Sequence, residues 1–166
     1  MKYLSEVYII ILWSESLYIK DKIIADIKKK FEIIEITIIE WSENVFFENL
    51  FIFYNGELPI YSEKDKYSGN MPFYCLVIRD NNVKYENILT PLGNNIKINI
   101  NLYKAKKLYR IWTNGGHKIH TSDNILETDY QLKLLFGKTY MDYLRMGTNN
   151  KIHYLKQDLI YRSEVV

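Results

Sequence analysis

The stretch HKIHTSDN at residues 117–124 leads into an amphipathic segment that ends in LLFG at residues 134–137. This junction predicts a short strand followed by a helix, with Asp123 or Asn124 as the helix N-cap. The start of a helix offers backbone N–H groups and the positive end of the helix dipole, so it suits a phosphate group. A histidine beside such a site, here His120, can act as a nucleophile toward phosphorus.

The flanking sequence predicts alternating strands and helices. Runs of apolar β-branched residues predict strands, and apolar residues three or four positions apart predict helices. Strands are expected at 7–13, 33–41, 73–79 and 118–120, and helices are expected at 19–31, 43–54, 103–113 and after Asn124.

Other segments give further expectations. Residues 55–70 contain two glycines and a proline and are expected to be mostly loop. Residues 83–89 are expected to form a short helix. Strict alternation over 94–102 predicts an amphipathic edge strand, whose apolar side would support an assembly. A wrapping tail should follow Gly137, with these side chains as anchors: Tyr140, Tyr143, Leu144, Tyr154 and Leu155.

The order of these elements predicts an α+β protein. A ferredoxin-like split βαβ sandwich fits best, with an antiparallel sheet and helices on one face. A chain of 166 residues suits one domain, 1–166, with a core at about 7–137 and a C-terminal tail at 138–166.

Composition limits the classes of partner. The net charge is +2 and the basic runs are short, so we expect no nucleic-acid partner. No apolar segment reaches the roughly 20 residues that a membrane span needs, and the apolar run at 7–13 is too short for a signal peptide. The single cysteine, Cys75, lies in an apolar run and favours a reducing compartment. We therefore expect a cytoplasmic protein without a membrane partner.

The motif at 117–124 resembles the Asn-Ile-Ile-His-Gly-Ser-Asp-Ser segment of nucleoside diphosphate kinases. The helix that ends at Phe136 matches that family's apolar-aromatic cluster without a gap from His120. Upstream, SGNMPFYCLVI at 68–78 is similar to the family's Ser-Gly-Pro segment and third strand, and the short helix expected next would end, as the family's does, in LG at 92–93. The resemblance covers roughly residues 7–137 and implies a nucleoside-diphosphate-kinase-like fold.

The resemblance also implies a reaction. In that family a phosphoryl group passes from a nucleoside triphosphate, with Mg²⁺ on the phosphates, through a phosphohistidine to a diphosphate, and the proteins form homo-oligomers. By position, His120 is the nucleophile candidate, and Ser122 stands for the serine in the hydrogen-bond network at the histidine. Gln131 stands where the family has the glutamate that orients the imidazole. An amide can still accept the ring N–H, although it stabilises a developing cation less than a carboxylate does.

Comparison by position with the same family also gives candidate nucleotide-binding residues. Tyr61 lies near the aromatic residue that stacks on the base, and Tyr54 near the tyrosine of the family's first helix. His117 replaces an asparagine of the sugar and phosphate region, Lys107 replaces an arginine directed to the phosphates, and Asn95 replaces a threonine. No protein metal site is expected, because His117 and His120 point to opposite faces of a strand.

Two departures from the family leave other functions open. The phosphate-binding lysine after the first strand is missing, because LWSE at 12–15 stands there, and the arginine before the LG pair is replaced by Asn87 or Ile88. Phosphoryl transfer depends on positioning and charge neutralisation. The alternatives are a catalytically impaired nucleotide-binding or scaffold protein, and an altered phosphoryl or nucleotidyl transferase with Glu15 as base. His120 as a structural histidine and Tyr61 as a loop anchor are the corresponding structural interpretations.

Overall fold

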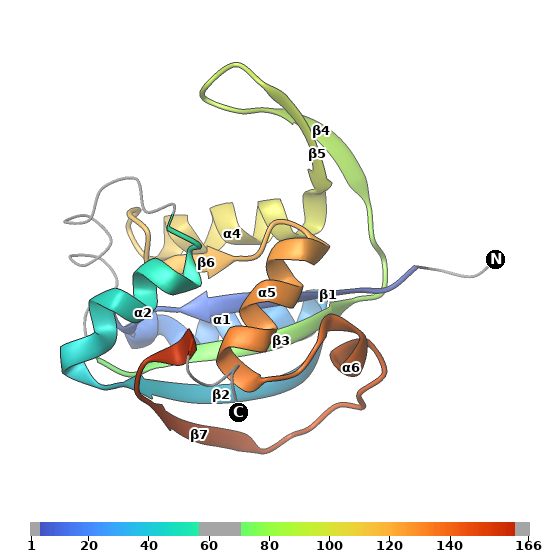
Figure 1. The fold of residues 1–166 in the computed structure, drawn as a ribbon. Helices are drawn as coiled ribbons and strands as arrows, with labels where there is room; N and C mark the ends of the chain where they lie inside the picture. Colours follow the sequence, from blue (N-terminus) through green and yellow to red (C-terminus); the bar gives the residue numbers. More distant parts are fainter. Residues whose placement is uncertain (1–3, 57–70, 162–166) are drawn as a thin grey trace.

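The structure is a computed structural model, which describes residues 4–56 and 71–161 (Figure 1). The strands in these residues are β1 (Glu6–Leu12), β2 (Glu32–Trp41), β3 (Phe73–Asp80), β4 (Tyr85–Leu89), β5 (Asn95–Asn99), β6 (Ile119–Thr121) and β7 (Ile152–Gln157). The helices are α1 (Lys20–Lys30), α2 (Phe46–Phe53), α4 (Ile100–Trp112), α5 (Ile125–Phe136) and α6 (Tyr140–Leu144), with 3₁₀ turns η1 (Ser14–Ile19) and η2 (Glu43–Val45). None of the helices in these two ranges has the length and apolar character that a membrane crossing requires.

A five-stranded sheet in the order β6-β1-β3-β2-β7 forms the centre of the molecule. The first four strands pair antiparallel in the arrangement of a split βαβ sandwich, which confirms the predicted α+β class. The fifth strand, β7, pairs parallel to β2, so the sheet is mixed rather than wholly antiparallel. Because β7 comes from the segment predicted to be a wrapping tail, its strand is a correction to the sequence analysis.

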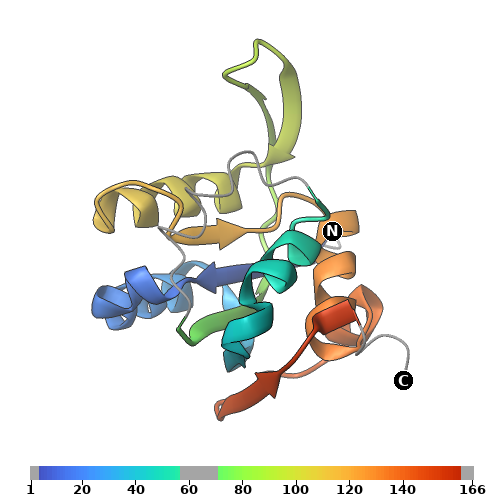
Figure 2. The same ribbon diagram turned by 60° about the vertical axis from the view of Figure 1, so that its left-hand side comes forward.

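Helices cover both faces of the sheet, and the prediction of helices on one face is wrong. Helices α1 and α4 pack against Tyr8, Ile10 and Leu12, whereas α2, α5 and α6 lie on the side of Val7 and Ile9 (Figures 1 and 2). The reason is the composition of β1, in which every residue is buried. A strand that is apolar on both sides needs a layer on each face to keep it from water.

Strands β4 and β5 form a hairpin that projects from the body above α4 (Figure 1), where a short helix and an edge strand were predicted. The first prediction is wrong because β4 alternates, and its Ile88 pairs with Ile96 of β5. Gly93, with φ +85°, allows the turn between them. The predicted edge strand at 94–102 is right only as far as Asn99. The side chain of Asn99 accepts a hydrogen bond from the Asn101 amide, and α4 begins there.

The C-terminal tail contributes buried side chains to the core as well as strand β7. Tyr140 and Tyr143 of α6 are buried, Leu144 and Leu155 pack against the core, and Tyr154 is 57% exposed. The chain returns through residues 145–151 and then pairs β7 with β2, which covers an edge that β2 would otherwise present to solvent.

Arg79 of β3 ties this returning segment to the sheet. Its guanidinium pairs with Glu32 at 2.9 Å and is only 12% exposed. It also donates to the carbonyl oxygens of Tyr143 and Leu144, at 3.2 and 3.1 Å, and to that of Met146. These are carbonyls at the end of α6, which the helix itself leaves without partners.

Candidate functional site

A cavity of about 440 Å³ opens where β6 passes into α5, with α2 and α4 forming its sides. His120, Glu127 and Gln131 line it, together with Tyr54 and Lys106. A larger hollow of about 610 Å³ lies on the outer side of α2, but its lining is mainly apolar and includes no histidine or cysteine. The smaller cavity is therefore the candidate for chemistry.

The His120 side chain is held tightly at the cavity wall. In the pairing of β6 with β1, His120 lies opposite Ile11 and is 7% exposed. The edges of Phe53 and Tyr54 meet its ring, each with a centroid distance of 5.1 Å. Two aromatic neighbours at steep angles leave little freedom for the imidazole plane.

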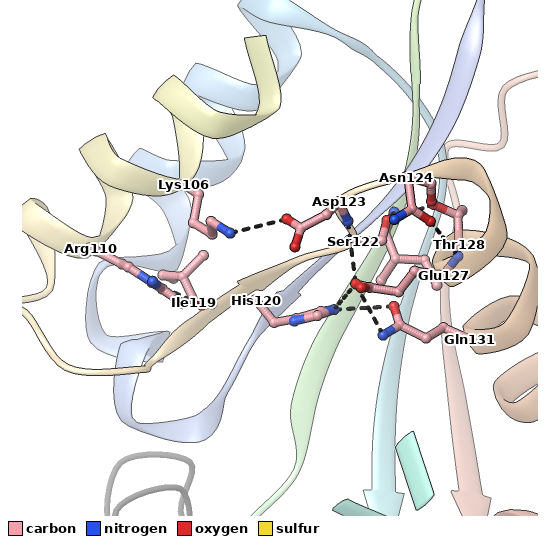
Figure 3. A network of polar contacts seen from close by, with 11 residues as sticks. Lys106, Arg110, Ile119, His120, Ser122, Asp123, Asn124, Glu127, Thr128 and Gln131 are labelled. Carbon is pink, nitrogen blue, oxygen red and sulfur yellow. Dashed lines mark hydrogen bonds and ion pairs between the residues drawn. The ribbon is translucent and has the colours of Figure 1, made fainter. Parts of the chain in front are cut away.

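Gln131 is a polar partner of this imidazole. Its amide nitrogen donates to Oε1 of Glu127 at 3.5 Å, so its oxygen faces His120 Nε2 at 3.1 Å (Figure 3). An amide oxygen accepts, so this arrangement pairs it with a hydrogen on Nε2. In the neutral tautomer with that hydrogen, the lone pair belongs to Nδ1.

Glu127 stands between the helix start and the imidazole. Asn124 caps α5 by accepting from the Glu127 amide at 2.8 Å, as the sequence predicted for Asp123 or Asn124. The Glu127 carboxylate accepts from the Asp123 amide at 3.3 Å and lies 3.6 Å from His120 Nε2. Burial raises the pKa of Glu127 to about 7, and the negative charge of Asp123 adds to the rise.

Glu127→Gln is expected to stabilise the fold at pH 8 by about 2 kcal/mol. A carboxyl whose folded pKa is raised from 4.5 to about 7 loses stability as pH rises through that window, by roughly 1.4 kcal/mol per pKa unit, less what the partly exposed side chain regains from water. Urea unfolding at pH 4.5 and pH 8 measures the difference. The gain should be small at pH 4.5, and exposed Glu43→Gln should show none at either pH. An equal effect of Glu127→Gln at both pH values would contradict the shifted pKa.

The cations near the cavity come from α4, at positions that differ from the predicted one. Lys106 lines the cavity and pairs with Asp123 at 3.3 Å. Arg110, one turn later, donates to the Ile119 carbonyl at 3.3 and 3.1 Å, and burial lowers its pKa. Lys107 is exposed over the Tyr103 ring, outside the lining of this cavity.

Helical phase was the signal that would have located these cations. Ala105 and Tyr109 form the buried stripe of α4. Lys106 and Arg110, one position after each, flank this stripe on a common side, whereas Lys107 lies a further 100° around the helix. Alignment by position with the family motif selected Lys107 and passed over both.

Ser122 lies beneath the junction of β6 and α5. It is fully buried, and its hydroxyl oxygen accepts from the Ile9 amide at 3.0 Å and from the Thr128 hydroxyl at 2.8 Å. These bonds tie the segment between His120 and α5 to the central strand. Ser122 therefore holds the backbone that carries the imidazole.

The structure places the remaining candidate residues in different parts of the molecule. Tyr54 lines the cavity, and burial raises its pKa, which keeps its phenol neutral. His117 precedes β6 and Asn95 opens β5 in the projecting hairpin; neither lines the cavity. Tyr61 lies outside the described residues.

Aromatic packing fills the place of the missing lysine. Trp13 directly follows β1, is fully buried and has its ring centroid 6.0 Å from Phe53 and 6.4 Å from Tyr54. Because these rings border His120, Trp13 forms a floor beneath the rings, and it does not itself line the cavity. Glu15, the base considered in one alternative, is exposed in the first turn of η1, and the cavity lining does not include it.

Acidic groups in the site do not form a metal cage. Within residues 4–56 and 71–161, no three or more His, Cys, Asp or Glu side chains gather so as to hold an ion. Mg²⁺ that arrives on phosphates carries most of its ligands with it and needs no such cage.

Comparison with known proteins shows the fold. No protein-family model matches the chain, and no curated protein matches it by sequence. Among solved structures, it is similar to the nucleoside diphosphate kinase of Aquifex aeolicus in its orthorhombic C222 crystal form. The identity is 18%, the TM-score is 0.54, and the match covers 80% of this chain and 96% of that one. The chain thus has a nucleoside-diphosphate-kinase-like fold, as the resemblance predicted, with a buried histidine at a cavity of that fold.

Proposed function

We propose that the protein is a nucleoside-diphosphate-kinase-like phosphotransferase that carries a phosphoryl group from a nucleoside triphosphate on His120. The main support is the contact of His120 Nε2 with Gln131 Oε1 at 3.1 Å within the wall of a cavity. The fold likeness adds to this support. A ligand site is usually a concave cavity that carries a few polar groups, as this one does.

The proposed step is a displacement at phosphorus. Nδ1 of His120 forms a bond to the γ-phosphorus while the bond to the bridging oxygen breaks, and the diphosphate leaves with that electron pair. The ring becomes cationic and keeps its hydrogen on Nε2, toward Gln131. A second diphosphate then takes the phosphoryl group by the reverse reaction.

Phosphate charge needs neutralisation in this mechanism. Lys106 lines the cavity, Arg110 donates to the carbonyl of Ile119 just before His120, and the start of α5 borders the cavity. We propose that the nucleotide brings Mg²⁺ bound to its own phosphates. Bound there, Mg²⁺ would neutralise phosphate oxygens during transfer.

A second candidate is a nucleotide-binding protein without turnover. It is favoured by Trp13, which occupies the end of β1 with an aromatic cluster instead of a cation. It is also favoured by Lys106 and Arg110, which hold protein groups, namely Asp123 and the Ile119 carbonyl. Phosphates would have to displace these contacts to gain the charges.

Labelling with γ-³²P ATP and Mg²⁺ tests the proposal. The wild-type protein should take a label that is stable in base and lost in acid, and GDP should remove it. His120→Ala should carry no label, because the attacking nitrogen is gone. The matched control is His153→Ala, since His153 is exposed on β7 and bonded to Asn149. Absence of label on folded wild-type protein would reject the phosphotransferase.

Calorimetry on the same samples identifies the second candidate. If the wild-type protein binds ATP or GDP but takes no label, the nucleotide-binding function replaces the first proposal. If neither heat nor label is observed, both are rejected. Because His120→Ala leaves the cavity open, it should retain binding in either case.

A further inference from the structure

One carboxylate oxygen meets three groups at the centre of the site. Oε1 of Glu127 lies 3.6 Å from His120 Nε2, 3.5 Å from the amide nitrogen of Gln131 and 3.3 Å from the Asp123 backbone nitrogen. Figure 3 shows this convergence as dashed lines from His120, Gln131 and Asp123 that meet at the Glu127 carboxylate. Because the Gln131 amide donates to Glu127, the carboxylate also determines which atom of Gln131 faces the ring.

We infer that Glu127 is a positioning residue for His120, which orients the imidazole through Gln131 and stabilises the positive charge that the ring gains when it accepts a phosphoryl group. This inference rests on the phosphotransferase function proposed above. Attack through Nδ1 places part of the new charge at Nε2–H, next to the Gln131 oxygen and the Glu127 carboxylate. A fixed negative charge at that distance stabilises a cation more than a neutral amide alone does.

The charge on Glu127 depends on the groups that face it. Asp123 and burial favour its neutral form, whereas Lys106 on α4 favours the carboxylate. Arg110 on the same helix adds positive charge near Asp123, and Tyr54 at the end of α2 stays neutral. With a pKa of about 7, Glu127 becomes charged as pH rises through neutrality. The contribution of Glu127 to the rate of His120 phosphorylation should therefore grow over the same range.

The test separates rate from binding. At pH 8, Glu127→Gln should lower the rate of His120 labelling at saturating Mg-ATP about tenfold, which corresponds to the loss of one charge-assisted contact. The Mg-ATP concentration for half-maximal rate should stay the same or fall, because a negative charge has left the cavity. At pH 6 the labelling rates of the wild-type protein and Glu127→Gln should differ less than threefold. A residue that only supported the fold would lower the maximal labelling rate and raise the Mg-ATP concentration for half-maximal rate, and it would do so at every pH.

A rescue variant and a control complete the design. Exchange of the two side chains, Glu127→Gln with Gln131→Glu, keeps one carboxylate and one amide at Nε2 and should restore the rate to within about threefold of wild type. Glu15→Gln, exposed on η1, should label like the wild type.

The outcomes distinguish the two proposals. If wild type labels on His120 and Glu127→Gln labels at the same rate and with the same pH profile, the role of Glu127 is overturned while the phosphotransferase stands. If the exchange variant stays as slow as Glu127→Gln, the positioning role is overturned as well. If folded wild-type protein takes no label, the function and this inference both fail.

Discussion

Trp13→Ala is expected to lower the free energy of unfolding by about 4 kcal/mol, which is the usual cost of removing a buried tryptophan. Trp13 has no exposed surface, and its ring packs against Phe73 at 4.7 Å and Trp41 at 6.1 Å between centroids. Neighbours this large cannot close around an alanine, so a cavity should remain beneath Phe53 and Tyr54. Urea unfolding followed by circular dichroism measures the loss.

Trp13→Phe is the matched control, because it keeps an aromatic ring at the same place. It should cost about 2 kcal/mol, nearer the cost of deleting a few methylene groups. If Trp13→Ala costs less than 1 kcal/mol, the aromatic floor beneath Phe53 and Tyr54 does not contribute as described. Loss of the floor should also loosen His120, which Phe53 and Tyr54 hold at its edges.

Arg79→Ala is expected to destabilise the protein by about 3 kcal/mol. The variant removes the partner of Glu32 and leaves carbonyl groups at the end of α6 without a donor. The cost arises mainly from the carbonyls of Tyr143 and Leu144, which stay poorly solvated without a donor. Glu32 contributes less, because it is 35% exposed and keeps a hydrogen bond from Asn81. The loss should appear in urea unfolding, and amide exchange should rise first in α6.

Arg145→Ala provides the comparison for that variant. Arg145 follows α6 directly but is exposed, so its removal should change stability by less than about 0.5 kcal/mol. Equal effects of the two arginine variants would show that Arg79 does not anchor the returning chain.

The core of the fold was predictable because its strands are strongly apolar and its helices strongly periodic. The strands expected at 7–13, 33–41 and 73–79 appear as β1, β2 and β3, and the helix after Asn124 appears as α5. The local sequence pattern gave a wrong prediction where the structure of a segment depends on pairing with another strand. Residues 83–89 carry no strong helical stripe, and they form a strand because β5 folds back on them across Gly93.

The two faces of the sheet could not be assigned from alternation. A strand such as β1, apolar at each position, gives no periodicity, and only its length and position indicate that helices cover both sides. The strand β7 was missed for a different reason. It is largely exposed and polar, and its pairing with β2 depends on contacts across more than a hundred residues.

For the candidate site, motif spacing located the residues on β6 and α5 but not those that arrive from elsewhere. The structure brings His120, Gln131 and Tyr54 to one cavity, while their chemical roles remain predictions. Lys106 was missed because alignment by position ignores helical phase. Glu127 was missed because nothing in a sequence shows that a carboxylate in the first turn of a helix also reaches an imidazole.

The late position of β7 has a consequence for synthesis of the protein. The edge of β2 that β7 covers belongs to residues 36–41, whereas its partner is residues 152–157. On the ribosome, β2 has therefore left the exit tunnel long before its neighbour exists. During that interval an apolar strand edge is open to nascent chains nearby, which is a condition that favours aggregation. A holding chaperone, or slow release of the first half of the chain, would protect this edge until the sheet can close.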